Sequence, residues 1–178
     1  GVTTLYVSND PEESMAVADR MAVLDDGRIV QVGRPLDLYC WPVSRVVASL
    51  VGTPPMPIAS ARVVAGPAGP CIEVGPVRVR AREADLSGAA GHAVDVGIRP
   101  EHVVIDPDGV AATVVGVENY GSHSHVLVSL DDDVTVLMRS GHVPPALFSR
   151  IRVRVLGLHV FDQITGEAVC HMERPQQD

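Results

Sequence analysis

The sequence contains no lysine and few aromatic residues. All 14 of its basic residues are arginine, they face 22 acidic residues, and the formal net charge at pH 7 is −8. Aromatic residues make up 3% of the chain. A nucleic-acid surface needs clustered cations, and single-stranded nucleic acids also need aromatic side chains on which bases stack. The composition therefore argues against a nucleic-acid partner.

Cysteine is also scarce, and long apolar runs are missing. Cys40, Cys71 and Cys170 are far apart and lack the spacing of metal ligands, so we expect free thiols in a reducing compartment. No apolar run approaches the roughly 20 residues that a membrane span requires. The chain starts with Gly-Val-Thr-Thr rather than with a methionine and a signal peptide. We therefore expect it to be a piece of a longer protein.

Residues 1–52 have an α/β pattern. The apolar, β-branched residues 2–7 predict a buried strand. Asp10 is the expected N-cap of a helix that has Pro11 in its first turn and runs to about Arg20. The other expected elements are strands over 21–24 and 28–32 joined by the turn Asp25-Asp26-Gly27, a helix over 35–40, and a helix over 45–51 that Ser44 caps and Gly52 ends.

Residues 53–178 have the pattern of an all-β domain that begins in the proline-rich stretch Thr53-Pro54-Pro55-Met56-Pro57. Short valine-rich segments alternate here with Gly, Pro and Asp turns, which is typical of a sandwich or barrel. The expected strands are 61–64, 71–74, 77–82, 93–98, 102–105, 111–118, 123–130, 134–139, 151–156, 159–161 and 168–171, with a further turn at 144–149.

Several strings, in order along nearly the whole chain, resemble one protein family. Residues 7–10, 18–24 and 26–35 (Asp-Gly-Arg-Ile-Val-Gln-Val-Gly-Arg-Pro) resemble the end of an ABC-type ATPase domain. Residues 51–56 (Val-Gly-Thr-Pro-Pro-Met) resemble its maltose-type, carbohydrate-importing branch. Residues 97–102, with Arg99-Pro100-Glu101, then 118–122 and 161–166 (Phe-Asp-Gln-Ile-Thr-Gly) resemble the C-terminal barrel of that branch.

The resemblance implies a mainly β fold. An oligonucleotide-binding-like barrel of the transport-associated type would follow an α/β remnant of the ATPase domain, with the boundary between 52 and 53. It also implies a homodimer that binds ATP and Mg in the parent protein and works with membrane-spanning permease subunits. The barrel would receive a regulatory protein or a small-molecule signal. The parent would lie at the cytoplasmic face of the cell membrane.

The chemistry of ATP hydrolysis is not expected in the chain itself. That reaction needs a phosphate-binding loop with its lysine, a Mg-binding acid and a catalytic glutamate. The loop motif Gly-x-x-x-x-Gly-Lys-Ser/Thr is missing, as is the signature Leu-Ser-Gly-Gly-Gln. We therefore expect no catalytic residue and no bound cofactor in this polypeptide, whatever its parent does.

One position near the N-terminus would touch nucleotide in the parent. The resemblance places Asn9 where the family has a histidine that contacts the γ-phosphate, and Asn9 is the one residue with a possible cofactor-binding role. An asparagine amide donates a hydrogen bond but cannot carry a proton or a charge. Either the parent ATPase is impaired or its hydrolysis is regulated differently. Asn9 is equally well interpreted as a loop residue, and Asp10 as a helix cap.

Structural or regulatory roles are expected for a further set of residues: Asp10, Arg99, Glu101, Gly121, Asp162 and Gly166. For Arg99 and Glu101 we expect an ion pair or turn hydrogen bonds that lock the barrel halves together. His123 and His125 share a strand face, as metal ligands do, but lack a third ligand nearby, so no metal site is predicted. Arg78, Arg80 and Arg82 alternate along a strand and are expected to form a solvated face.

An alternative function is a stand-alone barrel that binds a small ligand such as an oxyanion or a sugar. Backbone amides hold oxyanions without lysine, and Gly121-Ser122 and Ser140-Gly141 are the segments that would supply them. Titration with molybdate, sulfate and a panel of sugars separates this function from a pure interaction module.

Overall fold

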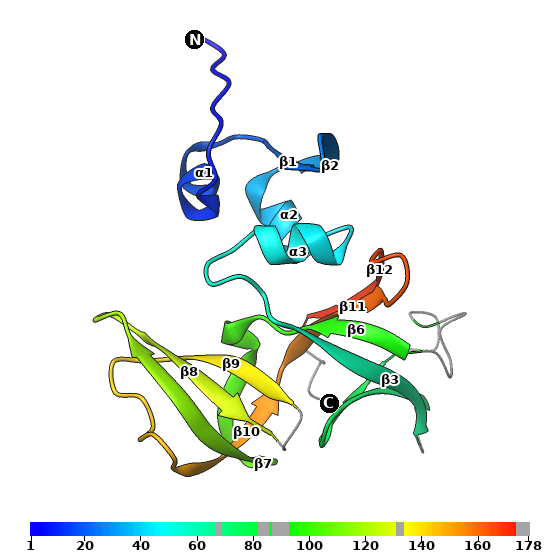
Figure 1. Ribbon diagram of the computed structural model, residues 1–178, viewed down its shortest axis with the longest axis vertical. Helices are drawn as coiled ribbons and strands as arrows, with labels where there is room; N and C mark the ends of the chain where they lie inside the picture. The colour runs from blue at the N-terminus through cyan, green and yellow to red at the C-terminus, as the bar shows by residue number, and fades with distance from the viewer. Residues whose placement is uncertain (67–68, 82–85, 87–92, 131–133, 174–178) are drawn as a thin grey trace.

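The computed structural model describes residues 1–66, 69–81, 86, 93–130 and 134–173 (Figure 1). Its N-terminal part consists of short helices and one hairpin. The elements are α1 (Pro11–Val17), β1 (Met21–Asp25), β2 (Arg28–Gly33), α2 (Pro35–Cys40) and α3 (Arg45–Leu50). These bounds agree with the sequence prediction to within one residue for every element except α1 and the segment before it.

Local signals account for these elements. The Asp10 carboxylate accepts a hydrogen bond from the Glu13 amide at 3.1 Å and so caps α1. Asp26 and Gly27 both have positive φ, 44° and 72°, as a two-residue hairpin turn requires. The prediction that α1 reaches Arg20 is wrong, because the helix ends at Val17. No residue of α1 is fully buried, and Met15 is its one residue in the apolar cluster of the N-terminal part, so little packing favours a longer helix.

The prediction of a buried strand over residues 2–7 is wrong. The segment has no regular structure, and its side chains face solvent, with Val2 91% and Leu5 92% exposed. A strand is stable only when a neighbour completes its hydrogen-bond ladder. None of the residues that the structure describes pairs with this segment. Its β-branched residues therefore do not form a strand.

The rest of the chain is mainly β, as predicted, and forms curled antiparallel sheets in the manner of an oligonucleotide-binding-like barrel. The six-stranded sheet has the order β12-β11-β6-β3-β4-β5, and the four-stranded sheet has the order β10-β7-β8-β9 (Figure 1). The bounds are β3 (Ile58–Gly66), β4 (Gly69–Val74), β5 (Val77–Arg80), β6 (Ala93–Gly97), β7 (Val103–Asn119), β8 (Ser124–Ser129), β9 (Thr135–Ser140), β10 (Arg150–Val155), β11 (Gly157–Asp162) and β12 (Ala168–Glu173), with a 3-10 turn η2 (Pro100–His102).

The long strand β7 replaces two predicted strands, 102–105 and 111–118. Its ladder with β10 skips from Ile105 opposite Val153 to Ala111 opposite Arg152, so residues 106–110 bulge out of the ladder. A Cβ on Gly109 would lie 2.2 Å from the carbonyl oxygen of Val153. Only glycine fits there, and this close approach keeps the bulge against β10.

Three apolar clusters hold the chain together. The largest joins the inner faces of both sheets and includes Ile72, Val96, Val128 and Val153. A smaller cluster in the N-terminal part contains Val23, Leu38, Val47 and Val51. A third contains Ala48, Met56 and Phe161 and lies where the two parts meet. Within the described ranges no helix is long and apolar enough to cross a membrane.

Candidate functional site

The contacts between the N-terminal part and the β sheets form the candidate site, which we call the junction. At its centre Arg99 is only 1% exposed. Its guanidinium donates hydrogen bonds to the carbonyl oxygens of Val51 at 2.7 Å and Ala48 at 3.4 Å, and to that of Tyr39 at 2.9 Å. These carbonyls lie at the C-terminal ends of α2 and α3, where backbone oxygens lack helical partners and the helix dipole favours a cation.

The aromatic ring of Tyr39 completes this arrangement. The Arg99 guanidinium carbon lies 3.8 Å from the ring centroid, a cation–π contact. The Tyr39 hydroxyl donates a hydrogen bond to the Glu101 carboxylate. Burial raises the pKa of Tyr39, and the hydrogen bond to Glu101 raises it further, so the hydroxyl stays a donor at physiological pH. The turn that follows β6 therefore holds α2 in two ways, through a backbone carbonyl of α2 and through the aromatic side chain of Tyr39.

The sequence suggested an ion pair or turn hydrogen bonds for Arg99 and Glu101 that lock the two halves of the barrel together. A turn hydrogen bond is present, because the His102 amide donates to the carbonyl oxygen of Arg99 at 2.9 Å. The side chains of Arg99 and Glu101 bond to Tyr39, Ala48 and Val51, which lie in the N-terminal part. Their effect is to tie the ends of two helices to the β sheets.

A second contact of the junction comes from the turn between β11 and β12. The Asp162 carboxylate accepts hydrogen bonds from the amides of Ile164 at 2.9 Å and Thr165 at 2.7 Å, which shapes the turn. Gly166 has φ of 74°, and its carbonyl oxygen accepts a hydrogen bond from the Arg45 amide at 2.9 Å. The turn thus supplies an acceptor for the first turn of α3.

The side chain of Arg45 returns to the β sheets. It forms an ion pair with Asp95, a carboxylate on β6 that is only 7% exposed. A Cβ on Gly166 would lie 3.0 Å from Nε of Arg45, so glycine leaves room for this side chain. Nearby, the Ala168 amide donates to the carbonyl oxygen of Val43 at 2.9 Å. Together these bonds attach the start of α3 as Arg99 attaches its end.

The junction collects four of the predicted residues: Arg99, Glu101, Asp162 and Gly166. It also uses three residues that sequence reasoning missed: Tyr39, Arg45 and Asp95. Asp95 carried a signal, because a carboxylate inside the apolar strand Ala-Val-Asp-Val-Gly is expected to be buried with a cationic partner. Nothing in the local sequence of Tyr39 or Arg45 indicates the distant groups that they bind.

The remaining predicted residues lie outside the junction. Asp10 caps α1, and the exposed Asn9 precedes it. Gly121 has φ of 83° in the turn between β7 and β8, and its amide donates to the Asn119 side chain at 2.8 Å. The Ser122 amide donates to a backbone oxygen at 3.1 Å. These two amides are therefore engaged, and the oxyanion site predicted for them lacks their donors.

The two histidines after this turn lie together, as their spacing predicted. The ring centroids of His123 and His125 are 5.0 Å apart, and Tyr120 stacks on His123 at 5.4 Å. Burial lowers the pKa of His125, and the neighbouring His123 lowers it further. In the described part of the chain no three His, Cys, Asp or Glu side chains gather as metal ligands would. The histidines serve here as part of an aromatic cluster.

A second histidine pair borders the junction. Nδ1 of His159 on β11 lies 2.8 Å from Nδ1 of His171 on β12. His159 is 1% exposed, and its burial, with smaller contributions from the charges of His171 and Arg99, lowers its pKa to about 3. The rings of Trp41 and His171 meet nearly perpendicular to each other, with a centroid distance of 5.5 Å. Neutral imidazole thus fills the space beside the buried guanidinium.

Each polar group of the junction is held by a specific partner. The Arg99 guanidinium is buried, the Tyr39 hydroxyl is kept protonated, and the Asp95 carboxylate is held by a cation. Satisfied polar groups in a buried place make a structure rigid, so these bonds fix α2 and α3 against the β sheets.

Comparisons with known proteins agree on one family. The profile of the TOBE domain matches residues 96–156. The sn-glycerol-3-phosphate import ATP-binding protein UgpC of Ruegeria sp. is 36% identical over 96% of this chain and 48% of its own length. The corresponding protein of Cupriavidus pinatubonensis is 35% identical over 95% of this chain and 50% of its own length. The maltose/maltodextrin import ATP-binding protein MalK of Vibrio vulnificus is 33% identical over 78% and 39%. The chain spans about half the length of the curated relatives it matches.

Proposed function

We propose that this chain, which belongs to the ATP-binding subunits of ABC importers that carry a TOBE domain, is the portion that regulates and dimerises such a subunit. Residues 1–52 would be the end of the ATP-binding domain, and residues 53–178 the regulatory domain. The names of the relatives support import of a sugar or a sugar derivative.

The buried Arg99 is the observation that carries the regulatory part of this proposal. It binds the carbonyls that end α2 and α3, and the opposite end of α3 is held through Arg45. A displacement of the β sheets would therefore move these helices as well. Such a link provides the coupling free energy by which a signal on one domain biases the state of another.

The exposed apolar side chains of the N-terminal part support a longer parent. Val2, Leu5, Leu24 and Ile29 are between 62% and 92% exposed. Large apolar side chains left exposed on both the first segment and the β1–β2 hairpin are consistent with surfaces that another part of a protein covers. In the parent we place ATP and Mg between two such subunits, membrane-spanning permease subunits beside them, and the assembly at the cytoplasmic face of the membrane. The chain itself would hold no cofactor.

Two measurements test the proposal. Calorimetry of the 178-residue chain with a non-hydrolysable ATP analogue and Mg should show no saturable binding, and such binding would contradict it. In the full-length subunit assembled with its permease, Arg99→Leu should change the rate of ATP hydrolysis or its response to transported solute at least about threefold, an effect of roughly 0.7 kcal/mol. Arg28→Ala, an exposed change at the start of β2, is the control. Equal rates and responses in both variants would remove the coupling role.

A further inference from the structure

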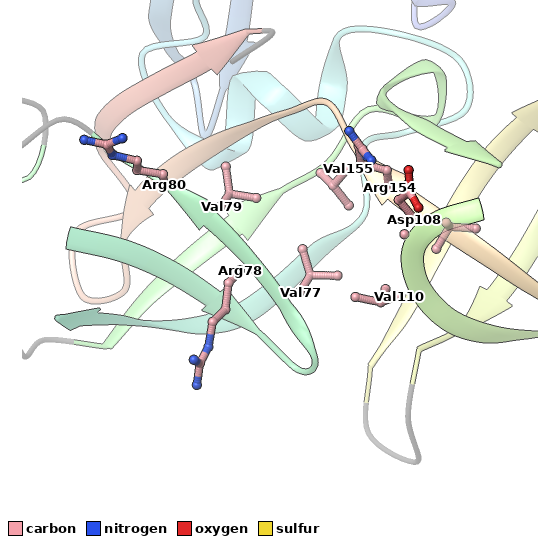
Figure 2. A pocket seen from close by; sticks show the side chains of 10 residues that line it. Val77, Arg78, Val79, Arg80, Asp108, Val110, Arg154 and Val155 are labelled. Atoms are coloured by element: carbon pink, nitrogen blue, oxygen red, sulfur yellow. The ribbon is translucent and has the colours of Figure 1, made fainter. Parts of the chain in front are cut away.

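Two strands end their sheets on either side of one cavity. β5 has only β4 as a neighbour, and β10 has only β7, among the residues that the structure describes. A cavity of about 310 Å³ lies between them, lined by Val77–Arg80 of β5, 153–155 of β10 and 108–110 of the β7 bulge (Figure 2). Its volume is at the lower end of the range for ligand sites, which starts near 300 Å³. We call this feature the seam.

The backbone of β5 is open toward the seam. The amide of Ala81 donates to the carbonyl oxygen of Pro70 on β4 at 2.9 Å. In an antiparallel ladder, residues with bonds to the neighbour alternate with residues whose bonds point the other way. Val77 and Val79 therefore bond to β4, whereas the amides and carbonyls of Arg78 and Arg80 point away from it.

The two faces of β5 carry different side chains, valine on one face and arginine on the other. Val77 and Val79 are buried and, in Figure 2, point into the cavity toward Val110 and Val155. Arg78 and Arg80 also line the cavity, but they are exposed and their guanidinium groups point away from the valines (Figure 2). Arg82, predicted to continue the pattern, lies outside the described residues. A strand added beside β5 would thus meet valine on one face and arginine on the other.

The guanidinium groups favour an acidic strand. Arg78 bonds to Glu73 at 2.8 Å, but its side chain remains 71% exposed, and exposed pairs of this kind are weak. Arg80 has no ion pair among the described residues. On a chain of net charge −8, two adjacent arginines on an open edge form a local attraction for carboxylates. A second copy of β5 in this position would place arginine against arginine, which is unfavourable.

We propose that the seam binds an extended peptide segment of a partner protein in which apolar and acidic residues alternate. The peptide adds a strand to β5, bonds to the outward backbone groups of Arg78 and Arg80, places its apolar side chains in the valine cavity and its carboxylates beside the two guanidiniums. This surface lies on different strands from the junction, so the inference goes beyond the proposed function and does not depend on it.

A labelled peptide of alternating valine and glutamate tests the seam by fluorescence anisotropy with the 178-residue chain. Saturable binding is expected. A peptide of equal composition in shuffled order, and one with lysine for glutamate, should each bind at least about tenfold more weakly, because they break the facial pattern or reverse the charge. Equal affinity of the shuffled peptide would overturn the proposal in favour of charge attraction alone, and absence of binding would overturn it outright.

Two substitutions of Arg78 distinguish the contribution of its backbone amide to peptide binding from the contribution of its charge. Arg78→Ala keeps the outward amide and should weaken binding about threefold, whereas Arg78→Pro also removes the amide and should weaken it at least about tenfold. Proline is tolerated at an edge position, and Arg28→Ala serves as a matched loss of one arginine far from the seam. Equal effects of alanine and proline would contradict strand addition.

Hydrogen exchange on the unmodified chain makes the test independent of how the variants fold. With peptide bound, the amides of Arg78 and Arg80 should become protected at least about tenfold, while those of Val77 and Val79, already bonded to β4, should change little. If the amides of β9 or β12 become protected instead, the peptide binds elsewhere and the assignment is rejected. It is also rejected if the chain without peptide has the molecular mass of a dimer that forms through β5.

Discussion

The N-terminal part and the β part differ in how much of their apolar side-chain surface they bury. The β part closes one continuous core between two sheets, to which side chains such as Ile72, Val114 and Leu158 contribute while fully buried. The N-terminal part buries only Val23 and a few helix residues, and leaves most apolar side chains of its first 33 residues exposed. The β part is therefore self-sufficient, whereas the N-terminal part depends on other surfaces.

This difference explains why the junction is rich in charge. A small part with little core of its own is attached by directional bonds at the ends of its helices, through Arg99 at one end and Arg45 at the other. Such bonds depend strongly on position, because a buried charge without its partners is costly. Because these bonds weaken when either part moves, they also suit a link through which movement of one part affects the other. The four predictions below test the contrast, from the largest expected effect to the smallest.

Two leucines compare the cores directly. Leu158→Ala in the β part should lower the free energy of unfolding by about 4 kcal/mol, because a fully buried leucine leaves a cavity. Leu24→Ala in β1, where the side chain is 64% exposed, should change it by less than about 0.5 kcal/mol. Urea unfolding followed by circular dichroism measures both. Similar losses would mean that the N-terminal part has a covered core after all.

The junction is tested by Arg99→Leu. The carbonyls of Tyr39, Ala48 and Val51 would lose their donor in a buried place, so we expect a loss of about 3 kcal/mol. Limited proteolysis should then cut the N-terminal part before the β part. Arg28→Ala, which removes an exposed arginine, should leave both measurements unchanged. A variant that is cut throughout the chain at one rate would contradict a link specific to the junction.

The free energy of unfolding should fall at acidic pH, because His159 is buried as a neutral imidazole. Its pKa is about 3 in the folded chain, against about 6.5 in an unfolded one. Below pH 6.5 the unfolded chain therefore binds a proton that the folded chain does not, and stability falls as pH decreases toward 3. Between pH 6.5 and 4.5 this residue should account for about 2 kcal/mol.

The contribution is isolated by comparing the pH dependence of unfolding in the unmodified chain and in His159→Gln. The variant should lose less stability over the same interval. His142→Gln, at an exposed histidine, is the control and should follow the unmodified chain. Parallel curves for all three proteins would show that His159 does not stay neutral in the fold.

The smallest effect is expected at the helix caps. Ser44 caps α3 through the Val47 amide, and Asp10 caps α1 through the Glu13 amide. Ser44→Ala should lower the free energy of unfolding by about 1 kcal/mol, because α3 belongs to the junction. Asp10→Ala should affect global stability by less than about 0.3 kcal/mol, because α1 buries no residue and frays locally. Equal losses would show that α1 unfolds together with the rest.

Much of the local structure could be predicted from the sequence, because its signals act over a few residues. The bounds of α2, the Ser44 cap and the Asp26-Gly27 turn follow from proline, serine and glycine at particular positions. The strand over residues 2–7 could not be excluded in this way. Its β-branched composition is genuine, but a strand exists only with a partner, and pairing is not a local property.

The candidate site shows the same limit. Arg99, Glu101, Asp162 and Gly166 were picked out because their motifs resemble those of a family, yet their common location was not visible in the chain. Arg99 lies 60 residues from Tyr39 along the sequence, and Arg45 lies 50 residues from Asp95. Long-range pairs of this kind depend on how the sheets are arranged, so only their tendency to be buried and bonded could be inferred beforehand.

The sequence by itself determined the mainly β character of the chain, its turns and caps, and the absence of a phosphate-binding lysine, because each depends on residue types in a short window. The tertiary structure alone decided which charges meet at the junction and that the arginines of β5 stand beside an open seam. Those outcomes depend on which strands become neighbours, and strand order is set by the packing of the whole core.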